Sequence, residues 1–197
     1  MKIKLKDFEK NKSINIIYLA VYKLKSSIFP IYHTSIVFNN KEYTFSCSNG
    51  FSQSELFMFA YHNEYFEFKY FIPLIKIDDS SIQIVYKYLN YLTDNINSSY
   101  YNIFAFNCNF VASNVVNKIY EELLKQSKAP IRINKIPKKI NRLAEMGYYV
   151  FKKIYSNLKL KTKKKILLRL DIDIYDEYEI ENYHNFVKQI RKDLRSQ

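Results

Sequence analysis

Four stretches of the chain are rich in apolar, β-branched and aromatic residues over lengths that suit β-strands. The second and third are separated only by Asn39 and Asn40, residues that tolerate the positive φ of a tight hairpin turn. Gly50, one of two glycines in the chain, indicates a further turn after the third stretch. The pattern therefore predicts an early hairpin with His33 on its first strand. The predicted strands span residues 14–24, 31–38, 41–46 and 68–77.

Apolar residues spaced three and four apart predict helices in the second half of the chain. One follows residues 78–80, whose side chains suit an N-cap, and another begins at or near Cys108. Residues 128–137 are expected to form a loop, and a third helix over residues 137–146 is expected to end at Gly147. The two apolar stripes are Ile82, Val85, Leu89, Leu92 and Ile96, then Val111, Val115, Ile119 and Leu123.

The charge pattern divides the chain into two parts. Residues 148–197 carry a basic cluster at 159–165 and an acidic stretch at 171–181, followed by a mixed, helix-like end. The 48% hydrophobic content of the 197 residues is enough to fill a core. We expect one domain over residues 1–147 and a charged helical extension over residues 148–197.

A formal net charge of +12 would favour acidic partners. However, abundant Lys, Asn, Ile and Tyr with few Gly resemble the product of an AT-biased coding sequence, which accounts for part of the charge. We therefore do not expect a nucleic acid partner. No signal peptide or run of about 18 apolar residues occurs, and two cysteines make no disulfide framework. These features predict a protein without a transmembrane segment in a reducing compartment, the cytoplasm or the nucleus.

Cys108 is the strongest candidate for chemistry, because the N-terminus of a helix favours the thiolate that acts as a nucleophile. Of the three histidines, His33 lies on a core element, whereas His62 and His184 fall in a loop and on a surface helix. The helix start could also offer the N–H of Cys108 to an oxyanion, with Asn107 and Asn102 as side-chain donors.

Local evidence alone leaves ordinary alternatives open. A single Cys before a helix is more often a small buried hydrophobe, and a single His on a strand is usually structural. Cys47, just after a strand end, is expected to pack against neighbours. Two Cys and three His match no metal motif, and no phosphate-binding loop occurs, so we expect neither a metal nor another cofactor.

Three segments in one order resemble the PPPDE/DeSI family. The sequence YHTSIV at 32–37, followed by EYTF at 42–45 and GF at 50–51, is similar to the family's histidine segment. The sequence YNIFAFNCN at 101–109 is similar to its cysteine motif, and IPKKI at 136–140 resembles its I-P-x-x-I segment. The resemblance covers about residues 14–147.

The resemblance implies an α+β domain with a circularly permuted papain-like fold, in which a small antiparallel sheet or barrel packs with helices. It implies His33 and Cys108 as the catalytic pair. It also implies activity on SUMO or ubiquitin conjugates, or on S-acyl thioesters, and a homodimer as in some relatives. Phe110, Val111 and Ala112 depart from the family's polar residues after the cysteine, and Ser46, Ser48 or Asn49 replace its usual glycines.

Three functions are therefore in competition. The first is a thiol isopeptidase in which His33 activates Cys108. The second is an S-acyl thioesterase, favoured if the aromatic residues between 51 and 71 line a groove and do not fill the core. The third is a binding module that has lost turnover through the change at residues 110–112 and uses its basic surface.

Overall fold

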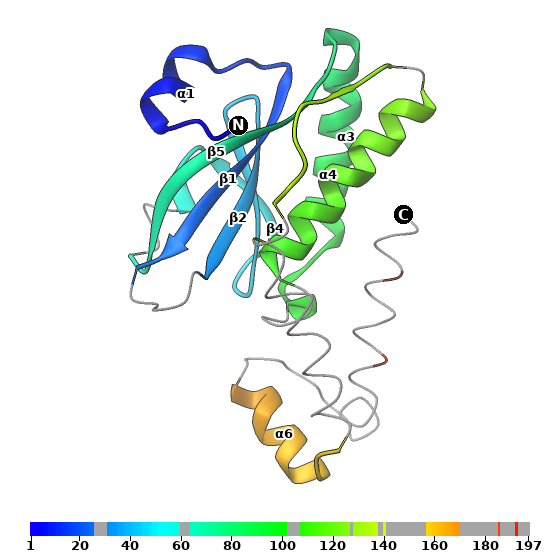
Figure 1. Cartoon of the computed structure of the whole chain (residues 1–197). Helices are drawn as coiled ribbons and strands as arrows, with labels where there is room; N and C mark the ends of the chain where they lie inside the picture. Colours follow the sequence, from blue (N-terminus) through cyan, green and yellow to red (C-terminus); the bar gives the residue numbers. More distant parts are fainter. Residues whose placement is uncertain are drawn as a thin grey trace.

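The protein is described by a computed structural model that covers residues 1–25, 31–59, 64–101, 107–126, 128–137, 140, 157–169, 185 and 192. Its centre is a six-stranded antiparallel sheet in the order β4-β3-β2-β1-β5-β6 (Figure 1). All four predicted strands are present. The strands are β1 (Ile16–Leu24), β2 (Tyr32–Phe38), β3 (Lys41–Ser46), β4 (Gly50–Glu55), β5 (Phe66–Lys76) and β6 (Ile131–Arg132).

The described helices include the helix predicted after residues 78–80 and the helix predicted to begin near Cys108. Their buried residues match the apolar stripes, with Val85, Leu89 and Leu92 in the first and Val111 and Val115 among those of the second. The helices are α1 (Leu5–Asn11), α3 (Ile82–Asn95), α4 (Cys108–Lys125) and α6 (Leu160–Arg169), with 3-10 turns η1 (Asp79–Ser81) and η2 (Ser98–Tyr100). The predicted α+β architecture, an antiparallel sheet packed with helices, is confirmed.

The two faces of the sheet are covered by different elements (Figure 1). Alternate side chains of β1, β2 and β3 form one core with α3 and α4, which includes Leu19, Ile36 and Phe45. The intervening side chains, such as Tyr22, face α1 and the segment after β4. This alternation follows from the two-residue period of a strand, and it places Thr34 on the α4 face and His33 on the opposite face.

Local structure differs from the sequence-based expectation at three places. Residues 128–137 are not all loop, because β6 pairs there with the end of β5. The residues expected to cap α3 form η1 instead, and the Ser80 hydroxyl donates to the Asp78 carboxylate at 2.9 Å. Before β1, the short helix α1, which was not predicted, buries Phe8, and Ile3 pairs with Phe71 of β5.

Other expectations fall largely outside the described residues. The predicted helix at 137–146 is represented only by its first residue and Ile140, whose N–H donates to the Pro137 carbonyl at 2.9 Å. Gly147 and the acidic stretch are not among the described residues. Within the part of the chain that the structure describes, no helix has the length and hydropathy to cross a membrane.

The turn before β4 requires a glycine. Gly50 has φ +69°, and a Cβ at this position would lie 2.5 Å from the carbonyl oxygen of Ile96. The next residue, Phe51, donates its N–H to the same oxygen at 2.8 Å. The β3–β4 hairpin is thereby held against the end of α3, close to where the chain turns toward Tyr101 and Cys108.

Candidate active site

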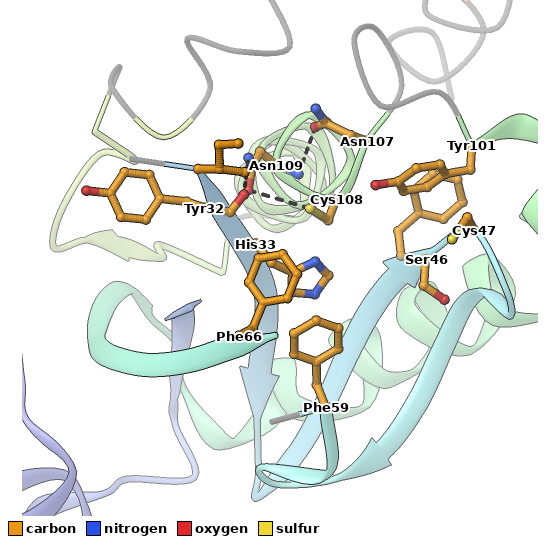
Figure 2. A pocket seen from close by; sticks show the side chains of 12 residues that line it. Tyr32, His33, Ser46, Cys47, Phe59, Phe66, Tyr101, Asn107, Cys108 and Asn109 are labelled. Carbon is orange, nitrogen blue, oxygen red and sulfur yellow. Dashed lines mark hydrogen bonds between the residues drawn. The ribbon is translucent and has the colours of Figure 1, made fainter. Parts of the chain in front are cut away.

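A cavity of about 160 Å³ lies where the start of β2, the end of β3 and the N-terminus of α4 converge (Figure 2). His33 and Cys108, which are 75 positions apart in the chain, both line it. Its wall is mainly apolar and aromatic, with polar groups concentrated at the start of α4. The lining residues are Ile31, Tyr32, His33, Phe45, Ser46, Cys47, Phe59, Phe66, Tyr101, Asn107, Cys108 and Asn109.

Cys108 is the first residue of α4, and the hydrogen bonding of the helix start leaves its N–H available. The side-chain oxygen of Asn107 accepts from the N–H groups of Asn109 and Phe110 at 3.0 and 3.1 Å. The Asn107 carbonyl accepts from Val111 N–H at 3.0 Å. Of the four N–H groups that open an α-helix, three are thus paired and that of Cys108 is not, among the described residues.

Asn109 fastens the start of α4 to β2. Its side-chain nitrogen donates to the Tyr32 carbonyl at 2.9 Å, and its side-chain oxygen accepts from the Thr34 hydroxyl at 3.0 Å. The Cys108 thiol donates to the same oxygen at 3.7 Å. These bonds flank His33 on both sides in the sequence, so one side chain fixes the nucleophile relative to the histidine strand.

The ring of His33 is buried, with 6% of its surface exposed, and is held on two sides. Nε2 lies 2.7 Å from the Thr44 hydroxyl. The Phe59 ring stacks on it with centroids 3.8 Å apart and an interplanar angle of 8°. Because Nε2 is engaged by Thr44, Nδ1 is the nitrogen that can serve Cys108 as a base.

A network of buried hydrogen bonds lies next to His33 on the same face of the sheet. The Tyr22 hydroxyl donates to the Glu42 carboxylate at 2.6 Å, and Phe57 N–H donates to its second oxygen at 2.9 Å. Burial raises the pKa of Glu42, whereas the hydrogen bond from Tyr22 opposes the rise. The centroid of the Tyr22 ring lies 6.0 Å from the centroid of the His33 imidazole.

His33 and Cys108 line one cavity at a place where the ladder between β2 and β3 is open. The β2–β3 ladder ends at the pair Ser35–Thr44, although β2 continues back to Tyr32 and β3 continues to Ser46. The backbone N–H of Thr34, beyond the last pair, interacts with the Cys108 thiol and favours its thiolate form. The opening in the ladder therefore connects a side chain on one face of the sheet with a helix on the other.

Burial keeps both reacting groups neutral in the free protein. It raises the pKa of Cys108 to about 11, outweighing the nearby N–H groups of Thr34, Asn109 and Cys108 itself, which lower it. It lowers the pKa of His33 to about 3. At neutral pH the pair is thus a thiol and a neutral imidazole, and Cys108 would have to give up a proton to react as a thiolate.

The other candidate residues have varied positions. Asn107 lines the cavity, but its side-chain oxygen caps α4, and Figure 2 shows its nitrogen on the side away from Cys108. Asn102, His62 and His184 lie outside the described residues. Cys47, expected to pack, is exposed and lines the cavity rim.

The departure from the family pattern after the cysteine does not reach the cavity. Phe110, Val111 and Ala112 are buried in the core beneath α4 and are not among the lining residues. Among the described residues, no group of three or more His, Cys, Asp or Glu side chains is placed to hold a metal ion. The cavity therefore presents a thiol, an imidazole and backbone donors as its reactive groups.

Two residues of the site were not identified from the sequence. Asn109 follows the cysteine in the N-C-N motif. The presence of an asparagine on each side of Cys108 was a signal in the sequence that could have identified it. Thr44 gave none, because a threonine on a strand is ordinary and its contact depends on how β3 lies beside β2.

Comparison with known proteins identifies the family of the chain. No curated protein matches the chain significantly. A family model described as "PPPDE putative peptidase domain" matches residues 2–153, which include α1, the whole sheet and α4. The match ends near the expected boundary at residue 147, which itself stays a prediction. The chain therefore belongs to the PPPDE peptidase domain family.

Proposed function

We propose that this protein is a thiol-dependent isopeptidase that removes a ubiquitin-like modifier, SUMO or ubiquitin, from lysine. The observation that carries the proposal is the shared cavity of Cys108 and His33, with Thr44 engaging Nε2 so that Nδ1 serves the thiol. A nucleophile, a base and a group that orients the base are the parts this chemistry needs. Membership of a peptidase family supports the same class of reaction.

In the first half of the reaction, Sγ of Cys108 attacks the carbonyl carbon of the isopeptide bond while its proton passes to Nδ1 of His33. The carbonyl oxygen becomes an oxyanion, which accepts a hydrogen bond from Cys108 N–H. The C–N bond then breaks, and the lysine amine leaves with the proton from Nδ1. The modifier remains attached to Cys108 as a thioester.

In the second half, neutral His33 removes a proton from water as the water oxygen attacks the thioester carbon. The C–S bond breaks, the sulfur takes the proton back from Nδ1 to restore the Cys108 thiol, and the modifier leaves as a carboxylic acid that loses its proton to solvent. Throughout both halves Nε2–H donates to the Thr44 hydroxyl, which holds the imidazole in one orientation. The protons that leave and return to the sulfur thus pass through Nδ1.

The test uses the full chain with lysine peptides joined through isopeptide bonds to SUMO or to ubiquitin. We expect cleavage of at least one conjugate, loss of it in Cys108→Ala, and a fall of roughly 10²-fold or more in His33→Ala. Cys47→Ala identifies which of the two cavity thiols reacts. Full turnover by Cys108→Ala, or its loss only in Cys47→Ala, would show that the nucleophile is misassigned.

A second candidate, an S-acyl thioesterase on the same pair, is supported by the apolar wall of the cavity. Phe59 and Phe66, two members of the aromatic run, line it together with Ile31 and Phe45. Other members of the run belong to the core instead, as Phe51 and Phe71 are buried and Phe57 and Phe68 pack, partly buried, against Phe71 and its neighbours. Turnover of a palmitoyl-thioester peptide without cleavage of the SUMO or ubiquitin conjugate would favour this function. If the protein turns over neither the thioester nor either conjugate, a binding module would be favoured.

A further inference from the structure

Tyr101 occupies a wall of the cavity beside Cys108 and has no role in the reaction described above. The residue follows η2 and lines the cavity. The centroid of its ring lies 5.4 Å from that of Phe45. In Figure 2 its hydroxyl points from the wall toward Cys108. The ring is thus fixed by the core while the polar end faces the reacting sulfur.

Acyl transfer through a thiolate generally uses two hydrogen-bond donors for the oxyanion, and the start of α4 supplies only one. Cys108 N–H is that donor, because the next three N–H groups are held by Asn107. The side-chain nitrogen of Asn107, which could donate, lies on the side away from Cys108 (Figure 2), and the Asn109 amide donates to the Tyr32 carbonyl. A second donor is therefore needed on the opposite side of the sulfur.

We propose that the Tyr101 hydroxyl is this second donor and contacts the oxyanion formed when Cys108 attacks an acyl carbonyl. The assignment rests on the thiol chemistry of the proposed function, but not on the identity of the acyl group. A pre-positioned donor aimed at developing charge is worth most in a cavity that excludes water. Tyr101 is then a catalytic residue of the acyl-transfer reaction.

The electrostatics of Tyr101 fit this role. Burial raises the pKa of its hydroxyl, and the neighbouring thiols of Cys108 and Cys47 raise it further, so the group stays protonated as a donor. Because Tyr101 lines the cavity, its hydroxyl lies where a bound acyl group can meet it.

The experiment compares Tyr101→Phe with the wild-type full chain in two reactions of the same sulfur. One is Cys108-dependent hydrolysis of p-nitrophenyl acetate, which passes through an oxyanion. The other is alkylation of Cys108 by iodoacetamide, which does not. We expect the hydrolysis kcat to fall roughly 10²-fold with little change in KM, and the alkylation rate to remain within about twofold. Tyr43→Phe, which removes a buried hydroxyl outside the cavity, is the matched control and should retain both rates.

Unchanged hydrolysis in Tyr101→Phe would overturn the proposal. An equal fall in both reactions would also overturn it, because Tyr101 would then act by packing around the thiol. Absence of Cys108-dependent ester hydrolysis in the wild type would overturn it as well. Ester hydrolysis that depends on Tyr101, without cleavage of SUMO or ubiquitin conjugates, would support this inference while contradicting the isopeptidase assignment.

Discussion

The hydroxyl of Thr44 lies 2.7 Å from Nε2 of His33, across the end of the β2–β3 ladder. In papain-like sites a third residue orients the imidazole, and the sequence offered no candidate for it. We propose that Thr44 has this role, with an uncharged oxygen. A neutral orienting group matches the neutral state of His33, since a carboxylate here would favour the imidazolium form.

Replacing Thr44 with Val should lower kcat roughly 10- to 100-fold, because the isosteric side chain leaves Nε2–H buried without an acceptor, at a cost of about 1–3 kcal/mol. Thr44→Ser keeps the hydroxyl and should retain most of the activity. Steady-state kinetics over a range of pH would separate the effects. A change confined to KM, or a Ser variant as impaired as Val, would contradict a role in orienting His33.

Asn109→Ala should weaken both the fold and the reaction, because it leaves the Tyr32 carbonyl and the Thr34 hydroxyl without their partner. We expect a loss of about 2–3 kcal/mol in the free energy of unfolding, measured with urea. Asn114→Ala, on the same helix, removes only the bond to the Phe110 carbonyl and should cost less than about 1 kcal/mol. Equal losses in the two variants would argue against Asn109 as the link between α4 and β2.

The alkylation rate of Cys108 in the free protein should rise with pH toward about 11, because burial raises the pKa of its thiol to that value. Only the thiolate reacts, and a raised pKa makes it scarce at neutral pH. Iodoacetamide kinetics on Cys47→Ala isolate Cys108. A rate that is already constant below neutral pH would instead reveal a preformed thiolate–imidazolium pair.

Glu42→Ala should destabilise the fold by about 2–4 kcal/mol, since the Tyr22 hydroxyl and the Phe57 N–H lose a buried acceptor. Glu42→Gln keeps an oxygen for Phe57 and an amide that can donate to Tyr22, so its cost should stay below about 1 kcal/mol.

The two variants of Glu42 also differ from the wild type in pH dependence. Its folded-state pKa is raised, so its contribution is present in full below the unfolded-state pKa and is lost as pH rises through the folded-state value. Glu42→Gln should lose this dependence. Urea unfolding at acid and neutral pH would show it, and identical profiles for wild type and Gln would contradict it.

The parts of the fold that were predictable depend on short-range rules. Asn39 and Asn40 form the hairpin turn with φ values of 46° and 62°, as their tolerance of positive φ indicated. The apolar residues spaced four apart after Cys108 likewise lie on one face of α4 and are buried. This could be predicted because the position of a residue around a helix depends only on its place in the sequence. The histidine and cysteine segments also resembled the family to which the chain belongs.

The parts that were not predictable depend on contacts between distant segments. Asn109 and Tyr32 are separated by 77 positions, and their bond exists only once α4 lies over the sheet. Nothing in the local pattern indicates that the β2–β3 ladder stops at Ser35 and Thr44. Phe59 stacks on His33 from a segment whose aromatic spacing gave no regular element. Such contacts are set by tertiary packing.

The attachment of Cys108 to β2 has an evolutionary consequence. The bonds of Asn109 hold the Cys108 end of α4 against β2, the strand that carries His33, and the bond from His33 to Thr44 reaches β3. Beyond Thr44, the end of β3 and the turn to β4 form the cavity rim, including Ser46 and Cys47. Sequence change in that hairpin can therefore alter which substrate enters while the reacting pair keeps its geometry, so new specificities can arise without loss of the chemistry.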